Sequence, residues 1–135
     1  MLPLLTNYGD LAALALRFAI SAIFIAHGWP KIKDLKTTAS NFEMMGFKPG
    51  NFWGTVVAVV EFIGGLCILF GFLTQIAAVL LAIDMLVASI WKIRSGQKLI
   101  GGYELDIILL TAALVLATLG PGIYSLDNYF PIVLF

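Results

Sequence analysis

The stretch "RFAISAIFIAHGWPK", residues 17–31, shows most clearly what kind of protein this is. It is apolar almost throughout, but Arg17 opens it and His27, the single histidine of the chain, interrupts it. The whole 135-residue chain has the same character, with 61% hydrophobic residues, 12% charged residues and a mean hydropathy of +1.00. A soluble domain of this length cannot cover so much apolar surface with so few charges, so the sequence predicts an integral membrane protein.

Four segments are apolar over the roughly 20 residues that a helix needs to cross the bilayer core. They lie near residues 10–28, 52–72, 74–93 and 103–120, and stretches rich in Gly, Pro and polar residues separate them. The N-terminal segment lacks the basic region of a signal peptide, so we expect the first helix to remain in the membrane. The expected fold is a single all-α domain, residues 1–135, forming a four-transmembrane-helix bundle.

The first connection, residues 29–51, is long enough to hold a further element. Its stretch "DLKTTASNFEMMGF" predicts a short amphipathic helix at the membrane interface. We expect Phe42, Met45 and Phe47 to face lipid or protein from this helix.

The basic residues predict the orientation of the chain in the membrane. Seven of the eight lie in the first and third connections. By the positive-inside rule, residues 29–51 and 94–102 are cytoplasmic and both termini lie outside, in a plasma or inner membrane. The seven residues are Lys31, Lys33, Lys36 and Lys48 in the first connection and Lys92, Arg94 and Lys98 in the third.

Three charged residues lie deep inside the predicted spans, away from their ends. Such a residue costs about 2.5–3.5 kcal/mol at the centre of the bilayer. The simplest arrangement is a structural ion pair between Arg17 and Glu61, which could serve packing alone. Asp84 has no counter-charge on its own helix face. It is therefore either neutral or shares Arg17, and in the neutral form it is a candidate proton carrier.

His27 ends the first predicted helix and Glu104 begins the fourth, so the two could meet near the cytoplasmic side. In that case Glu104 would orient the ring and His27 would contact a ligand head group. The alternative is an interfacial histidine that caps the helix end. Asp106 is expected to favour the helix N-terminus or to pair with Lys92 or Arg94.

Composition also limits the chemistry that the chain could carry alone. Cys67 is the single cysteine, which excludes an intramolecular disulfide and dithiol chemistry. One histidine excludes bis-histidine haem ligation, and the scattered carboxylates lack a recognisable metal-ligand spacing. No feature points to nucleic acid. Any electrons would have to come from a protein partner.

Five short motifs, in this order, resemble the DoxX family of small four-helix membrane proteins. They are Arg17 leading into "AHGWPK", "VEFIGGL" with Glu61, "GFLTQIAA", "GGYE" ending in Glu104, and "GPGIYSLD". The resemblance covers nearly the whole chain. It implies a more distant similarity to the DoxD subunit of thiosulfate:quinone oxidoreductase, and to proteins of methylamine dehydrogenase maturation and of thiol or oxidative-stress systems.

The chain departs from the usual pattern of this family in its third helix. Asp84 lies within that helix, and Lys92 with Arg94 stand where a histidine often occurs in the family. A ligand site carried over from the family therefore needs support from this chain's own residues.

The resemblance and the buried charges together suggest a membrane subunit of a quinone-linked or thiol/oxidative-stress redox system. Such a subunit would bind a quinone or lipid-like ligand and dock a redox partner, with no catalytic residue of its own. The alternatives are a non-catalytic membrane adaptor and a small proton-coupled transporter, and a homo-oligomer is compatible with each. The candidate residues for ligand binding or proton relay are His27, Glu61, Asp84 and Glu104.

Overall fold

The computed structural model describes residues 3–130, and all the secondary-structure elements in that range are helices. Four helical segments are long and apolar enough to cross a membrane. They are α2 (Gly9–Lys33), α4 (Gly50–Phe70), α5 (Thr74–Arg94) and the segment Leu99–Leu119, in which the π-helical turn η1 (Leu99–Tyr103) leads into α6 (Glu104–Leu119). Three shorter helices are α1 (Pro3–Thr6), α3 (Leu35–Met44) and α7 (Leu126–Tyr129). The predicted all-α, four-helix membrane fold is confirmed.

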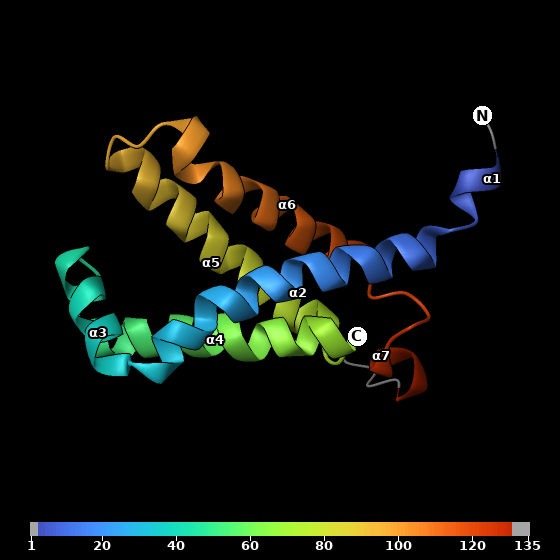
Figure 1. Ribbon diagram of the computed structural model, residues 1–135, viewed down its shortest axis with the longest axis horizontal. Helices are drawn as coiled ribbons and strands as arrows, with labels where there is room; N and C mark the ends of the chain where they lie inside the picture. The colour runs from blue at the N-terminus through green and yellow to red at the C-terminus, as the bar shows by residue number, and fades with distance from the viewer. Residues whose placement is uncertain (1–2, 131–135) are drawn as a thin grey trace.

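The long helices form two pairs that are joined closely at one end and separate at the other (Figure 1). Helix α2 packs mainly on α4, and α5 packs mainly on α6. Helix α3 lies at the end where the pairs separate, whereas α7 lies at the opposite end, beside the C-terminus of α4. The separated ends of the two pairs and α3 therefore lie around the same end of the molecule.

The first long helix does not stop at residue 28, where the sequence "GWPK" suggested a break. It continues through Pro30 to Lys33. A proline removes only one backbone donor, and neighbouring helices can compensate for it in a membrane protein. Because the helix continues, Lys31 projects from the same face of α2 as Phe24 and His27.

Helices α2 and α4 approach each other closely at two glycines. A Cβ atom on Gly28 would lie 2.6 Å from the backbone nitrogen of Phe62, and one on Gly65 would lie 2.9 Å from Cγ1 of Ile25. Small residues at such positions let helix backbones pack tightly in a membrane. This close contact holds α2 and α4 together as one of the two helix pairs.

We expect the substitution Gly28→Ala to lower the free energy of unfolding by about 1–3 kcal/mol, because the added methyl group meets backbone that cannot move freely. Titration with sodium dodecyl sulfate in mixed micelles measures this quantity. Gly9→Ala is the matched control, since a Cβ there has no atom within 4 Å. Equal stability of the two variants would contradict the close packing.

The predicted amphipathic helix of the first connection is present as α3. The carboxylate of Asp34 caps it by accepting a hydrogen bond from the backbone nitrogen of Thr37 at 3.0 Å. This bond, together with one from the Thr37 hydroxyl, lowers the pKa of Asp34 below its usual value. At the other end of α3, Glu43 accepts a hydrogen bond from the backbone nitrogen of Gly50. Both ends of α3 are thus fixed.

Candidate ligand-binding cavity

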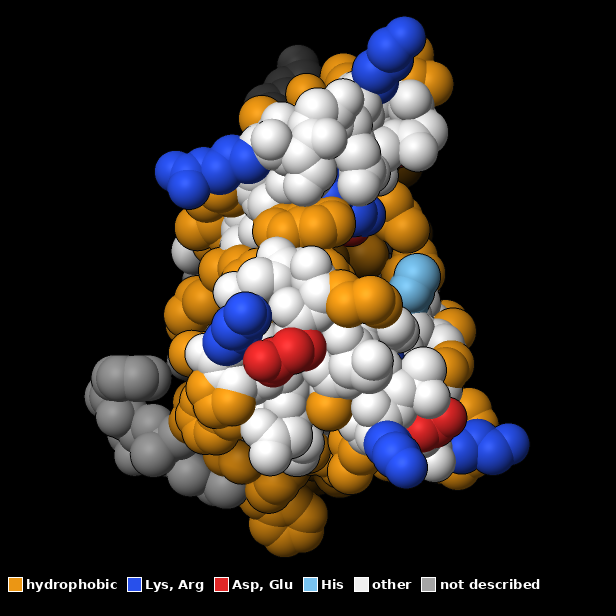
Figure 2. Space-filling model, turned by 90° about the vertical axis from the view of Figure 1, so that its left-hand side faces the viewer, with side chains coloured by type: hydrophobic (Ala, Val, Ile, Leu, Met, Phe, Trp, Pro, Cys, Tyr) orange, Lys and Arg blue, Asp and Glu red, His pale blue; other side chains and the backbone are white. Residues whose placement is uncertain are grey.

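A cavity of about 670 Å³ lies where the two helix pairs separate. Residues of α2, α3, α4, α5 and α6 line it. The space-filling view shows a hollow at this end of the molecule, with basic and acidic side chains visible inside it (Figure 2). Its volume falls in the range of about 300–1,000 Å³ that is typical of sites for small organic ligands.

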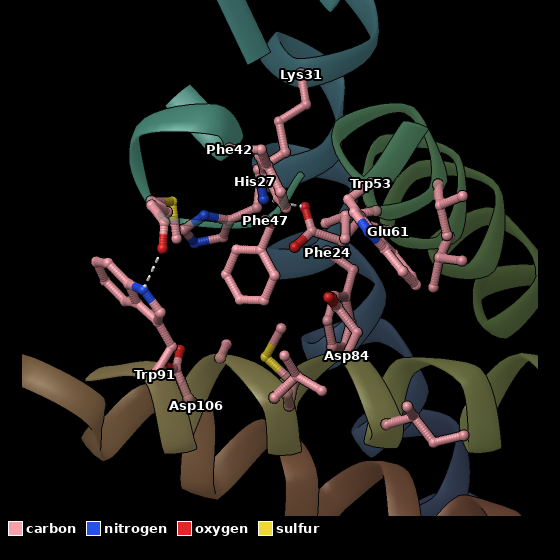
Figure 3. Close-up of a pocket in the computed structure, with 18 of the residues that line it drawn as sticks. Phe24, His27, Lys31, Phe42, Phe47, Trp53, Glu61, Asp84, Trp91 and Asp106 are labelled. Carbon is pink, nitrogen blue, oxygen red and sulfur yellow. Dashed lines mark hydrogen bonds and ion pairs between the residues drawn. The ribbon is translucent and has the colours of Figure 1, made fainter. Parts of the chain in front are cut away.

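Aromatic and aliphatic side chains form most of the cavity wall. The indole nitrogen of Trp91 on α5 donates a hydrogen bond to the backbone oxygen of Met45, at 3.0 Å. This bond ties the segment after α3 to α5 and closes one side of the cavity (Figure 3). The aromatic residues of the wall are Phe24, Phe42, Phe47, Trp53 and Trp91.

Six ionisable side chains also line the cavity, which is unusual for so apolar a chain. They come from four different helices and meet because helix spacing places them on inward faces. Among residues 3–130, no cluster of three or more His, Cys, Asp or Glu side chains is arranged to hold a metal ion. The six residues are His27, Lys31, Glu61, Asp84, Lys92 and Asp106.

Four of these residues form two ion pairs. The ammonium group of Lys31 lies 2.5 Å from Oε2 of Glu61, and that of Lys92 lies 2.7 Å from Oδ2 of Asp106. The second pair agrees with one of the alternatives expected for Asp106, a pairing with Lys92. In both pairs the lysine is partly exposed and the carboxylate is buried. The lysines therefore reach the carboxylates from the open end of the cavity.

The predicted ion pair between Arg17 and Glu61 is wrong. Glu61 binds Lys31, whereas Arg17 lies beside the C-terminal end of α4, away from the middle of that helix where Glu61 is located. Arg17 is 1% exposed, and within residues 3–130 all the hydrogen-bond acceptors of its guanidinium are backbone oxygens. The acceptors are Ile68 at 2.9 Å, Leu69 at 2.7 Å, Tyr124 at 2.6 Å and Pro121 at 3.3 Å.

The physical reason is that the last carbonyl groups of a helix have no partner within it and carry partial negative charge. Arg17 binds two of those of α4, on Ile68 and Leu69, and joins them to the chain before α7. Asp127 completes this arrangement by accepting hydrogen bonds from the backbone nitrogens of Leu73 and Thr74, at 2.8 and 2.9 Å. Sequence reasoning missed this role of Asp127, although "GFLT" (71–74) and "SLD" (125–127) both contain residue types that are common in turns and helix caps.

The fifth charged side chain, Asp84, lies at the middle of α5 and points toward Glu61 (Figure 3). Both carboxyl groups line the same cavity. Oδ2 of Asp84 is buried, and no N–H or O–H donor among residues 3–130 bonds to it. Within that range, Asp84 thus has no ion pair of its own.

The structure does not bring His27 and Glu104 together in one site. His27 lines the cavity and is exposed, whereas Glu104 is not part of the cavity wall. The Glu104 carboxylate instead accepts a hydrogen bond from the backbone nitrogen of Gly101 at 3.0 Å, within the kinked turn before α6. Of the four candidate residues, His27, Glu61 and Asp84 share the cavity.

Comparison of the sequence with known proteins identifies the family of this chain. The family model described as DoxX matches residues 12–92, more than half of the chain. The chain belongs to the DoxX family. The match includes Arg17, His27, Glu61 and Asp84.

Three DoxX-type relatives are matched over almost their full length. The inner membrane protein YqjF of Escherichia coli (strain K12) is 35% identical over 88% of this chain and 92% of its own. CatD of Bacillus subtilis (strain 168), provisionally named an oxidoreductase, is 31% identical over 89% and 87%. The uncharacterized membrane protein Rv3486 of Mycobacterium tuberculosis (strain ATCC 25618 / H37Rv) is 30% identical over 93% and 85%. No solved structure gives a significant match.

Proposed function

We propose that this DoxX protein is the membrane subunit of a redox system and binds a quinone or lipid-like ligand in the cavity between its helix pairs. The observation that carries the proposal is the combination of aromatic walls with several charged side chains in one cavity of ligand size. Apolar walls bind the ring and tail of such a ligand, and a few polar groups fix its orientation. The oxidoreductase name of CatD supports a redox role.

The electrons would come from a protein partner, because the chain has one cysteine and one histidine and so no carrier of its own. The partner would dock at the end of the molecule that carries α3 and the turn between α5 and α6. This end holds most of the basic residues, and by the positive-inside rule it faces the cytoplasm. The cavity opens at the same end, so a docked donor would lie near the ligand.

Tryptophan fluorescence tests ligand binding directly. Trp53 and Trp91 line the cavity, whereas Trp29 lies outside it and packs on Phe62 with a ring-centroid distance of 5.6 Å. The Trp29→Phe variant in lipid nanodiscs should therefore show saturable quenching by a short-chain quinone. Quenching that rises linearly with quinone, as for free indole in lipid, would contradict the proposal.

A second pair of variants locates the binding site. Ala88→Phe places a ring in the cavity and should weaken quinone binding about tenfold or more. Val79→Phe adds a similar ring to an exposed position of the same helix, 47% exposed, and should leave the affinity unchanged. Equal affinities of the two variants would place the ligand elsewhere.

A further inference from the structure

Asp84 is the carboxyl group left over when the charges of the cavity are paired. Lys31 binds Glu61 and Lys92 binds Asp106, which leaves one carboxyl of the cavity wall without a cation among residues 3–130. If all five groups were ionised, the cavity would carry one excess negative charge. An uncompensated carboxylate at the middle of a membrane helix is strongly unfavourable.

The groups that surround Asp84 do not supply the missing positive charge. From α4 and α6, the carboxylates of Glu61 and Asp106 repel an anion at Asp84. From α2, Lys31 attracts it, but Lys31 is already bound to Glu61. On α5 itself Lys92 is bound to Asp106, and His27 lies at the exposed side of the cavity. A proton is the simplest counter-charge.

A hydrogen bond between the facing carboxyl groups of Asp84 and Glu61 needs the same proton (Figure 3). Two ionised carboxylates are both acceptors and cannot hydrogen-bond to each other, whereas a carboxyl pair with one proton can. We infer that Asp84 and Glu61 share a single proton in the cavity and that Asp84 donates it in a hydrogen bond to an oxygen atom of the bound ligand. With this proton in place, the five charged groups of the cavity sum to zero.

Lys31 allows the O–H group of Asp84 to change its acceptor from Glu61 to the ligand. Glu61 keeps its ion pair when the O–H group of Asp84 turns from Glu61 to the ligand, so no buried carboxylate loses every partner. The ligand class that fits is a ring with a carbonyl oxygen and an apolar tail. The donor role rests on the proposed function, whereas the shared proton does not depend on a ligand.

Infrared spectroscopy of the ligand-free protein in lipid tests the shared proton. We expect the C=O stretching band of a protonated carboxylic acid at neutral pH, and we expect Asp84→Asn to remove it. Ser89→Ala is the matched control on α5, because Ser89 is buried and its hydroxyl donates a hydrogen bond to the backbone oxygen of Met85 rather than to a cavity carboxyl group. Absence of the band, or a band that survives Asp84→Asn, would overturn the inference.

Ligand binding tests the donor role. Adding a short-chain quinone should shift the carboxylic acid band, and Asp84→Leu should weaken quinone binding about tenfold while Asp84→Asn, which keeps an N–H donor, weakens it less. A band that does not move, or equal binding by the Asp84→Leu variant and the unmodified protein, would refute the donor role. If the unmodified protein binds no quinone, the proposed function fails, and the band of the ligand-free protein still decides whether the proton is shared.

Discussion

Replacing Arg17 by methionine should destabilise the protein severely, by about 4 kcal/mol or more. The guanidinium donates four hydrogen bonds to backbone oxygens of two chain segments that are far apart in the sequence. Methionine has a similar length but no donor, so the carbonyl groups of Ile68 and Leu69 at the end of α4 would lose these partners. Titration with sodium dodecyl sulfate gives the loss in the free energy of unfolding.

Two further variants separate the role of hydrogen bonding from that of charge. Arg17→Lys keeps the charge, but one ammonium group cannot reach acceptors that a planar guanidinium spans, so it should recover only part of the stability. Lys33→Met removes an exposed basic residue from the same helix and should have little effect. If Arg17→Met were no more damaging than Lys33→Met, the assigned role of Arg17 would be wrong.

The fold could be predicted from the sequence because the bilayer imposes a length and a composition on each spanning helix. The long apolar runs around Phe24, Glu61 and Asp84 satisfied both requirements, and the short helix α3 followed from its amphipathic pattern. Lys92 was also among the expected partners of Asp106, because the two residues lie on either side of the connection between α5 and α6. In each case the information is local in the chain.

The partners of Arg17 and Glu61 could not be predicted, because they depend on where helices end and how they are staggered. Reading "GWPK" as a break in the first helix removed Lys31 from the residues that could reach Glu61. Arg17 binds backbone carbonyl groups, and because every residue carries one, the sequence does not show which of them it binds. Only the three-dimensional structure shows which carboxyl group lacks a cation.

The second large loss of stability is expected when the ion pair of Lys31 and Glu61 is broken. The loss in the free energy of unfolding should differ between the two residues. The Lys31 side chain is 30% exposed, whereas that of Glu61 is 4% exposed. Without Glu61, the long lysine side chain can extend toward water, so Glu61→Gln should cost about 1 kcal/mol. Without Lys31, a buried carboxylate remains, so Lys31→Met should cost about 3 kcal/mol. The double variant Lys31→Met/Glu61→Gln should be more stable than Lys31→Met alone, because it leaves no buried carboxylate at this position. If the costs of the two single substitutions simply added, that would argue against a direct ion pair.

The cost of Lys31→Met should also depend on pH, because the pair of Asp84 and Glu61 can restore neutrality in the variant by binding a second proton. The folded state would then hold more protons than the unfolded state, whose carboxyl groups are ionised at neutral pH. Stability falls with rising pH whenever the folded state binds the extra protons. Unfolding titrations should therefore show a larger deficit for Lys31→Met at alkaline than at mildly acidic pH, and no such trend for the matched Lys33→Met. A deficit that is constant over pH would mean that the cavity tolerates the unpaired charge, which would also remove the charge argument for a shared proton.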